Sequence, residues 1–243
     1  MITATWYGHA TVLLEVDGLR VLTDPLLRPR LGHLRRYATL PALPAAPDVV
    51  VISHLHWDHL DLASLRLLGA DTRLVVPRGA GALLHRAGFA RVDEIGIGES
   101  LHLEGVRIEA TPVAHSGFRP PFGPTVRAAG YLIEGSRRVY FAGDTALFPE
   151  MTALAAGDLA LLPVGGWGPW LRGGHLDPDD AAEAARRIRP ATALPVHWGT
   201  YWPAGVRRNA RFALPGVRFA EAASRTAPAV DVRVPPPGAR LTV

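Results

Sequence analysis

The segment His54-Leu55-His56-Trp57-Asp58-His59 decides how the rest of the sequence is interpreted. It follows the apolar run Asp48–Ser53 (DVVVIS), which predicts a buried strand, and precedes Leu60–Leu68, which predicts a helix. In extended backbone, His54 and His56 point to the same side. Asp58 and His59 then lie where the helix begins, turned toward a neighbouring point. One short segment can therefore offer ligands to two adjacent metal ions. A polar loop with capping residues is the ordinary alternative, but burying four polar groups there is costly.

Three further polar residues each close a predicted strand. They are His115 after Val106–Val113, Asp144 after Val139–Ala142 and His197 after Ala193–Val196. Taken singly, each has an ordinary alternative, a satisfied histidine or a turn-forming aspartate. Strand ends at one edge of a sheet open on a common cleft, so together with the histidine segment they complete a ligand set. Imidazole and carboxylate donors without thiolate suit zinc, with manganese or iron as alternatives.

Composition limits the class of protein. The chain has 243 residues, 48% of them hydrophobic and 20% charged, which predicts a globular fold with one domain over residues 1–243. Cysteine is absent, so zinc sites and nucleophiles built on cysteine are excluded. No apolar run is long enough for a membrane helix, and the N-terminus lacks the pattern of a secretory signal. We therefore expect a cytoplasmic protein without a transmembrane segment.

The charge pattern argues against nucleic acid as a partner. All 26 basic residues are arginine, which explains a pI of about 10.1 at a net charge of only +4. These arginines are scattered along the chain, whereas nucleic-acid binding usually requires a concentrated basic stripe.

Strands and helices alternate in both halves of the chain, which predicts a mixed α/β fold. Ile2–Tyr7, Thr11–Val16 and Leu19–Thr23 predict a meander with a hairpin turn at Asp17-Gly18, and residues 28–47 predict a long loop. The stretch beginning at Asp177-Pro178 predicts a helix that continues to about Arg189.

The motifs HLHWDH, TPVAH, FAGDT and PVHWGT, in this order and spacing, resemble the metallo-β-lactamase superfamily. The stretches TWYGHATVLLEVDGLRVLTDP and GGHLDPDDAAEAARRI resemble one branch of it, which holds N-acyl phosphatidylethanolamine phospholipase D and the ascorbate-6-phosphate lactonase-like hydrolases. The resemblance runs from about Thr5 to Tyr201. It implies a four-layer αββα sandwich with a binuclear metal site at one edge.

The resemblance also implies a role for each ligand. It assigns His54, His56 and His115 to the first metal, Asp58, His59 and His197 to the second, and Asp144 to a bridge between them. The implied reaction is attack by a metal-bridging hydroxide on a phosphorus or carbonyl carbon, with Asp58 orienting the nucleophile. The substrate is then a small-molecule or lipid-like ester or phosphodiester. A homo-oligomer is compatible with these features.

Three other residues match the branch with alternatives left open. Asp24 either supports the metal loop or forms a strand-terminating Asp-Pro turn. His175 either lies at the cleft, where it contacts or protonates the leaving group, or is an exposed loop histidine. His9 is expected to support the ligands or the fold.

The rim of the site is expected to come from loops. Trp167, Trp170 and Leu171, together with Phe118–Phe122, either grip an acyl chain or fill the fold's own layers. Arg119 or the pair Arg35-Arg36 is a candidate partner for a substrate phosphate.

Two competing functions remain at this stage. One is a non-catalytic metal-binding scaffold, and the other is a nuclease of the same superfamily. The intact ligand set argues against the scaffold, and the lack of a basic stripe argues against the nuclease.

Overall fold

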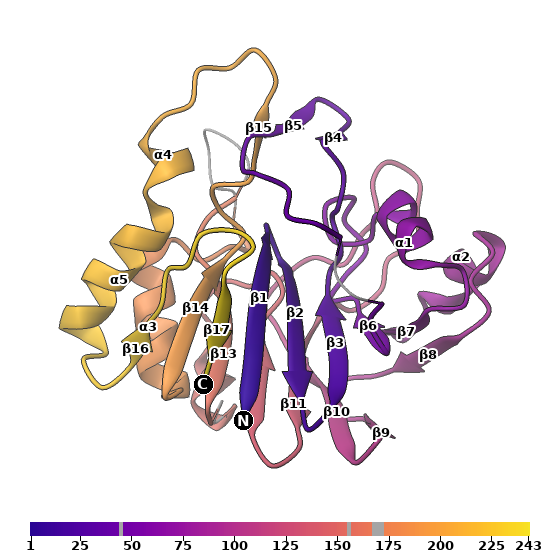
Figure 1. Cartoon of the computed structure of the whole chain (residues 1–243), viewed down its shortest axis with the longest axis horizontal. Helices are drawn as coiled ribbons and strands as arrows, with labels where there is room; N and C mark the ends of the chain where they lie inside the picture. Colours follow the sequence, from indigo (N-terminus) through magenta and orange to yellow (C-terminus); the bar gives the residue numbers. More distant parts are fainter. Residues whose placement is uncertain (44–45, 155–156, 167–172) are drawn as a thin grey trace.

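Two seven-stranded sheets and a small third sheet form the framework of the protein (Figure 1). The computed structural model describes residues 1–43, 46–154, 157–166 and 173–243. The first sheet runs in the order β17 (Arg240–Thr242), β1 (Ile2–Gly8), β2 (Thr11–Val16), β3 (Leu19–Thr23), β6 (Val49–Val51), β7 (Arg73–Pro77), β8 (Val92–Ile95). The second runs β16 (Asp231–Val232), β14 (Thr192–Val196), β13 (Leu159–Pro163), β12 (Arg138–Phe141), β11 (Ala129–Glu134), β10 (Val106–Pro112), β9 (Ser100–Leu103).

Helices cover the outer face of each sheet. The helices α1 (Leu62–Leu68) and α2 (Gly81–Arg86) pack on the first sheet. The helices α3 (Pro178–Ile188) and α5 (Pro215–Thr226), with the short 3₁₀ turn Pro149–Ala153, pack on the second. A single turn, α4 (Ala210–Ala213), precedes α5. The predicted mixed α/β fold with αββα layers is confirmed.

The central strands are buried on both faces, and their side chains alternate between two cores. In β13, Leu159 and Leu161 face the core between the sheets, whereas Ala160 and Leu162 face the core under α3 and α5. This is the two-residue period of a strand whose every position is apolar. A continuous apolar run therefore predicts that a strand is present, but it does not predict which core each residue faces.

The prediction that residues 28–47 form a long loop is wrong in part. This stretch contains a short hairpin, β4 (Arg30–Leu31) and β5 (Leu34–Arg36), and β5 pairs with β15 (Tyr201–Pro203). The pairing partner lies about 165 residues away, so local sequence carries no signal for it. The helix α5 was also not predicted, although Pro215 stands at its first turn.

The strand directions bring many strand ends to one edge. The strands β1 and β3 run in the same direction as β6, and β10 runs in the same direction as β12, β13 and β14. Their carboxyl ends meet at the upper edge in Figure 1, where ligand sites of parallel sheets form. Within the described residues, no helix has the length and apolar composition needed to cross a membrane.

The core between the sheets makes a testable contribution to stability. Phe141 is fully buried there, whereas Phe122 on a surface loop is 96% exposed. We expect Phe141→Ala to lower the free energy of unfolding by about 3–5 kcal/mol, because it removes a large side chain and leaves a cavity. The control Phe122→Ala should change it by less than about 0.5 kcal/mol. Urea denaturation of both variants measures this, and equal losses would contradict the assigned core.

Candidate metal centre

All the sequence-predicted ligands come together at the shared edge of the two sheets. His54–His59 follow β6, His115 follows β10, Asp144 follows β12 and His197 follows β14. The loops after β1, β3 and β13 add His9, Asp24 and His175. Seven strand ends therefore contribute to one cluster of imidazoles and carboxylates.

The loop between β6 and α1 turns sharply enough to present both halves of the motif. Its turn is closed by hydrogen bonds from the His59 and Leu60 N–H groups to the His56 carbonyl, at 3.1 and 2.8 Å. The helix begins only afterwards, where the Asp61 carboxylate accepts a hydrogen bond from Ser64 N–H. His54 thus precedes the turn and Asp58 and His59 lie on it, a few residues before the helix rather than at its first residues.

Three ring nitrogens converge on one side of the cluster. His56 Nδ1 lies 2.9 Å from His54 Nε2 and 3.2 Å from His115 Nε2. A tetrahedral ion with bonds of about 2 Å spaces its ligand nitrogens about 3.3 Å apart. The three nitrogens are therefore close to the spacing that a shared ion requires.

A second set converges on the other side. Asp58 Oδ2 lies 3.5 Å from His197 Nε2 and 3.7 Å from His59 Nε2, and these two nitrogens lie 3.1 Å apart. All three side chains are almost completely buried. This trio has the donor atoms and the spacing of a second ion site.

Asp144 lies between the two sets. Its Oδ2 is 3.2 Å from His59 Nε2 and 3.3 Å from His197 Nε2, and 4.0 Å from the Nε2 atoms of His54 and His115. Its Oδ1 is buried with no hydrogen-bond partner among the described residues. A buried carboxylate oxygen without a donor is costly, and a cation at this point would satisfy it.

Gly143 explains how Asp144 reaches this position. The glycine has φ +60°, and a Cβ there would lie 2.5 Å from Ser53 Cβ. A side chain at this position would therefore push the end of β12 away from the metal loop. The glycine of the FAGDT motif thus allows the close approach that places the carboxylate.

The remaining ring nitrogens are fixed by acceptors outside the cluster. His115 Nδ1–H donates to the Gly174 carbonyl at 2.7 Å, and His197 Nδ1–H donates to the Gly165 carbonyl at 2.9 Å. His59 Nδ1 lies 2.6 Å from Asp24 Oδ2, and His54 Nδ1 lies 2.9 Å from Ser53 Oγ. Because each Nδ1 has an oxygen partner, each Nε2 turns its lone pair inward, as metal-ligating histidines do.

The charges of the cluster call for positive compensation. Burial alone would raise the pKa of Asp144, but His197 and His59 reverse this and hold it well below its usual value. Burial alone would lower the pKa of His59, but Asp144, Asp58 and Asp24 raise it well above its usual value. In the absence of a cation, a proton on His59 balances the buried carboxylates. A metal ion can replace that proton.

Asp24 supports both halves of the metal loop. Its Oδ1 accepts Ser53 N–H at 2.7 Å, and its Oδ2 accepts Ser53 Oγ–H at 2.5 Å and His59 Nδ1–H at 2.6 Å. Ser53 Oγ in turn accepts His54 Nδ1–H. The buried carboxylate therefore orients one histidine of each set, His59 directly and His54 through Ser53. Of the two alternatives that the sequence left open for Asp24, the hydrogen bonds favour support of the metal loop over a simple Asp-Pro turn.

His175 lies beside the cluster and is largely buried, so it is not an exposed loop residue. Its side chain is 19% exposed, and its Nδ1 lies 3.3 Å from Asp144 Oδ2. Its ring is 4.9 Å from that of His115. Burial lowers its pKa to about 4, so the imidazole is neutral at pH 7.

His9 is the member of the cluster that sequence reasoning left least defined. Its Nε2 lies 3.0 Å from Asp58 Oδ2, and its ring packs 4.1 Å from that of His197. The signal for it was the WYGHAT motif at the end of β1, but the motif alone gives no partner.

The rim predictions have mixed outcomes. Trp167, Trp170 and Leu171 lie outside the described residues. Phe118 and Phe122 are exposed, so they do not fill the fold's layers.

Two of the three arginines proposed for a substrate phosphate are buried and bound to groups of the protein itself. Arg119 is buried and donates to the Leu55 and Leu60 carbonyls at 2.6 and 3.1 Å. Arg36 is buried against backbone carbonyls and Tyr201. The exposed guanidinium of Arg35 lies over the ring of Tyr37. The expectation for Arg119 and Arg36 is therefore wrong, because the fold uses their donors internally.

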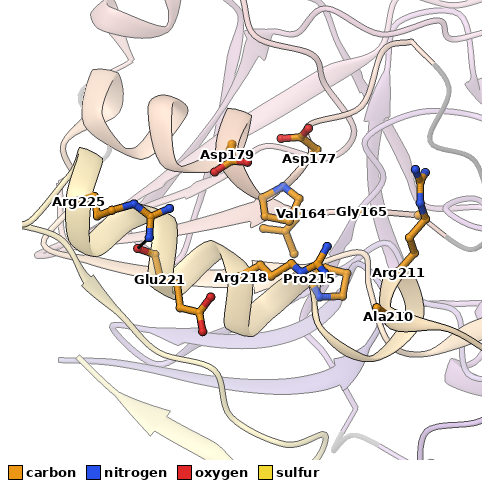
Figure 2. Close-up of a pocket in the computed structure, with 12 residues that line it drawn as sticks. Val164, Gly165, Asp177, Asp179, Ala210, Arg211, Pro215, Arg218, Glu221 and Arg225 are labelled. Atoms are coloured by element: carbon orange, nitrogen blue, oxygen red, sulfur yellow. Dashed lines mark hydrogen bonds between the residues drawn. The ribbon is translucent and has the colours of Figure 1, made fainter.

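A separate cavity of about 440 Å³ lies between α3, α4 and α5 (Figure 2). Asp177 and Asp179 of the α3 N-terminus line one side, and Arg211 and Arg218 line the other. Among the described residues that line it, Gly165 connects the cavity to the cluster, because its carbonyl accepts His197 Nδ1–H. It is therefore a neighbour of the metal centre and not the centre itself.

Comparison with known proteins agrees with this geometry. Residues 19–198 match the family described as "Beta-lactamase superfamily domain". The chain is 32% identical over 227 residues to an N-acyl-phosphatidylethanolamine-hydrolyzing phospholipase D of Caenorhabditis elegans, a match covering 82% of this chain and 64% of that protein. It is 32% identical over 206 residues to a UPF0173 metal-dependent hydrolase of Methanopyrus kandleri, covering 82% and 85%.

A solved structure extends the comparison to the whole chain. A metallo hydrolase of the archaeon Ignicoccus hospitalis superposes with a TM-score of 0.76 at 26% identity, covering 99% of this chain and 97% of that chain. By contrast, the chain spans only 59% of an uncharacterized Mycobacterium tuberculosis relative at 34% identity. The nematode and mycobacterial relatives thus carry further sequence that has no counterpart in the match.

The support given by Asp24 can be tested without any substrate. We expect Asp24→Asn to lower the free energy of unfolding by about 1–3 kcal/mol in chelator, because an amide cannot accept from both Ser53 Oγ and His59 Nδ1. The matched control is Asp48→Asn, which weakens a half-exposed pair with Arg20 and should cost less than about 1 kcal/mol. Denaturant titration measures both. Equal small losses would contradict the buried network.

Proposed function

The chain belongs to the β-lactamase superfamily, and we propose that it is a metal-dependent hydrolase that uses two divalent cations to cleave a phosphodiester or a cyclic ester. The observation that carries the proposal is the convergence of two ligand sets in which four of the five histidines, all but His56, have their outer ring nitrogen against an oxygen atom. Hydrogen bonds of this kind orient the inner nitrogens for a cation before one binds.

We assign His54, His56 and His115 to the first cation and Asp58, His59 and His197 to the second. Asp144 would help to hold both, because its Oδ2 lies within 4.0 Å of ring nitrogens from both sets. Five imidazoles and two carboxylates, without thiolate, favour zinc, with manganese or iron as alternatives.

The reaction divides between the cations and the chain's own residues. When bound, two cations supply a water of lowered pKa and stabilise the charge that develops on the attacked phosphorus or carbonyl carbon. Asp58 orients the attacking water through its carboxylate. His175, at the open side of Asp144, contacts the leaving group. Because its imidazole is neutral at pH 7, it does so as a hydrogen-bond donor and not as an imidazolium acid.

The rim supports a substrate with an apolar portion. Trp57 is 48% exposed, and Phe118 and Phe122 are exposed on the loop after His115. These aromatics stand beside the first ligand set and can contact an acyl chain. The name of the nematode relative, a phospholipase D acting on an N-acylated phospholipid, points to the same class. A small-molecule or lipid-like phosphodiester is therefore the substrate class we favour.

Metal content and turnover test the proposal together. We expect His56→Ala to lower bound metal and to abolish hydrolysis while the chain stays folded, because it removes one of the three histidine ligands of the first cation. Metal per chain by mass spectrometry and hydrolysis of bis-p-nitrophenyl phosphate and of a lactone panel are the measurements. His102→Ala, on an exposed strand position, is the matched control. Wild-type protein with two ions but no turnover on any of these substrates would favour the scaffold alternative.

The role of His175 has a different signature. We expect His175→Ala to keep both ions and to lower kcat by about 10²–10³-fold, because it removes a hydrogen-bond donor to the leaving group and no ligand. Metal analysis and steady-state kinetics on the same preparation measure this. Loss of metal from this variant would show that His175 is a ligand instead.

A further inference from the structure

The backbone at His9 is held in a conformation that non-glycine residues rarely adopt. Its φ is +52°, in the left-handed region, between the end of β1 and the start of β2. Its N–H donates to Thr200 Oγ1 at 2.7 Å, and its carbonyl accepts from Trp6 Nε1 and from His197 N–H, both at 2.9 Å. Strain of this kind costs on the order of 1–3 kcal/mol and persists where the surroundings fix it. Here the surroundings include a residue of the metal centre.

The strained backbone aims the imidazole at one atom. The His9 side chain is almost fully buried, and its Nε2 lies 3.0 Å from Asp58 Oδ2. Its ring is flanked by His197 at 4.1 Å and meets the edge of Tyr201 at 5.8 Å. The ring therefore has little freedom to turn away from Asp58.

The direction of the hydrogen bond follows from the acceptor. A carboxylate ligates a metal ion in its ionised form, and the proposed function assigns Asp58 to the second cation. An ionised carboxylate only accepts, so the proton is on His9 Nε2. The same Asp58 oxygen faces His197 Nε2 and His59 Nε2 at 3.5 and 3.7 Å.

We propose that His9 is a positioning residue that donates to Asp58 Oδ2 and thereby fixes this carboxylate toward the second cation. The inference rests on the proposed function, since it concerns that same site. His9 does not itself coordinate, because its nitrogen near the site carries the proton. Partners of this kind, which orient a ligand from outside, typically change metal affinity by about 10–100-fold.

The test uses metal-free full-length protein titrated with zinc against a chromophoric chelator, with cobalt absorption as a second readout. Wild type should bind two ions. His9→Ala should bind the first as wild type does and the second about 10–100-fold more weakly. His9→Gln should restore the second affinity, because its amide N–H extends to about the same place as Nε2. His85→Ala, an exposed position on α2, is the control and should match wild type.

A further variant tests whether lower stability, rather than the lost hydrogen bond, weakens binding of the second ion. His9→Asn suits the left-handed backbone better than other residues do, but its side chain is too short to reach Asp58. It should therefore fold at least as stably as His9→Ala and still bind the second ion weakly. If His9→Asn binds both ions as wild type does, the inference is overturned.

Coupling to Asp58 separates positioning from a general packing role. In an Asp58→Ala background, His9→Ala should change the second affinity by no more than about twofold, because its partner is already gone. An undiminished effect in that background would overturn the inference. Two ions in wild type with unchanged affinities in His9→Ala would overturn it while leaving the proposed function intact. Fewer than two ions in wild type would contradict the proposed function, and the His9 inference with it.

Discussion

The buried carboxylates at the shared sheet edge impose the constraint on which the rest of the site depends. Asp24, Asp58 and Asp144 are all nearly or completely excluded from solvent. An unpaired buried carboxylate is expensive, so each must find a donor or a cation. The surrounding imidazoles supply donors to some of these carboxylate oxygens and leave the others facing ring nitrogens. His115 and His197 donate from Nδ1 to backbone carbonyls, and His59 donates from Nδ1 to Asp24. The Nε2 atoms of these three histidines face the remaining carboxylate oxygens, and a cation or a proton between them would satisfy both.

The fold can hold these charged groups close together because rigid strands position them. Each residue of the cluster follows a strand whose own residues are buried in the cores. The two sheets are tied across the core next to the site, where Tyr131 OH donates to the Ile52 carbonyl at 2.8 Å. Left-handed backbone at His9, Asp24 and His197 turns the chain immediately after three strands end. The strain is thus placed where neighbouring strands can hold it.

Much of this could be predicted from the sequence, for physical reasons that also explain the failures. These polar residues follow apolar runs, and a strand's end is a local property, so the sequence could place His115, Asp144 and His197 at the shared sheet edge without a structure. Support roles are non-local, so Asp24, His9 and His175 stayed open until their partners were seen. The pairing of β5 with β15 was missed for the same reason. Arg119 was misassigned because a sequence shows a charge but not the carbonyls that already occupy it.

The Leu55 and Leu60 carbonyls join the loop after β6 to the loop after β10, and these two loops carry the first ligand set. Arg119 donates to Leu55 O and Leu60 O, which bracket the metal loop, and its guanidinium lies 3.9 Å from the ring centre of Trp57. Trp57 Nε1–H in turn donates to the Pro120 carbonyl at 2.9 Å. The loop carrying His56 and the loop after His115 are therefore cross-linked in both directions. Because the exposed aromatics Trp57 and Phe118 belong to these same loops, any substrate that contacts them meets a surface fixed relative to the ligands.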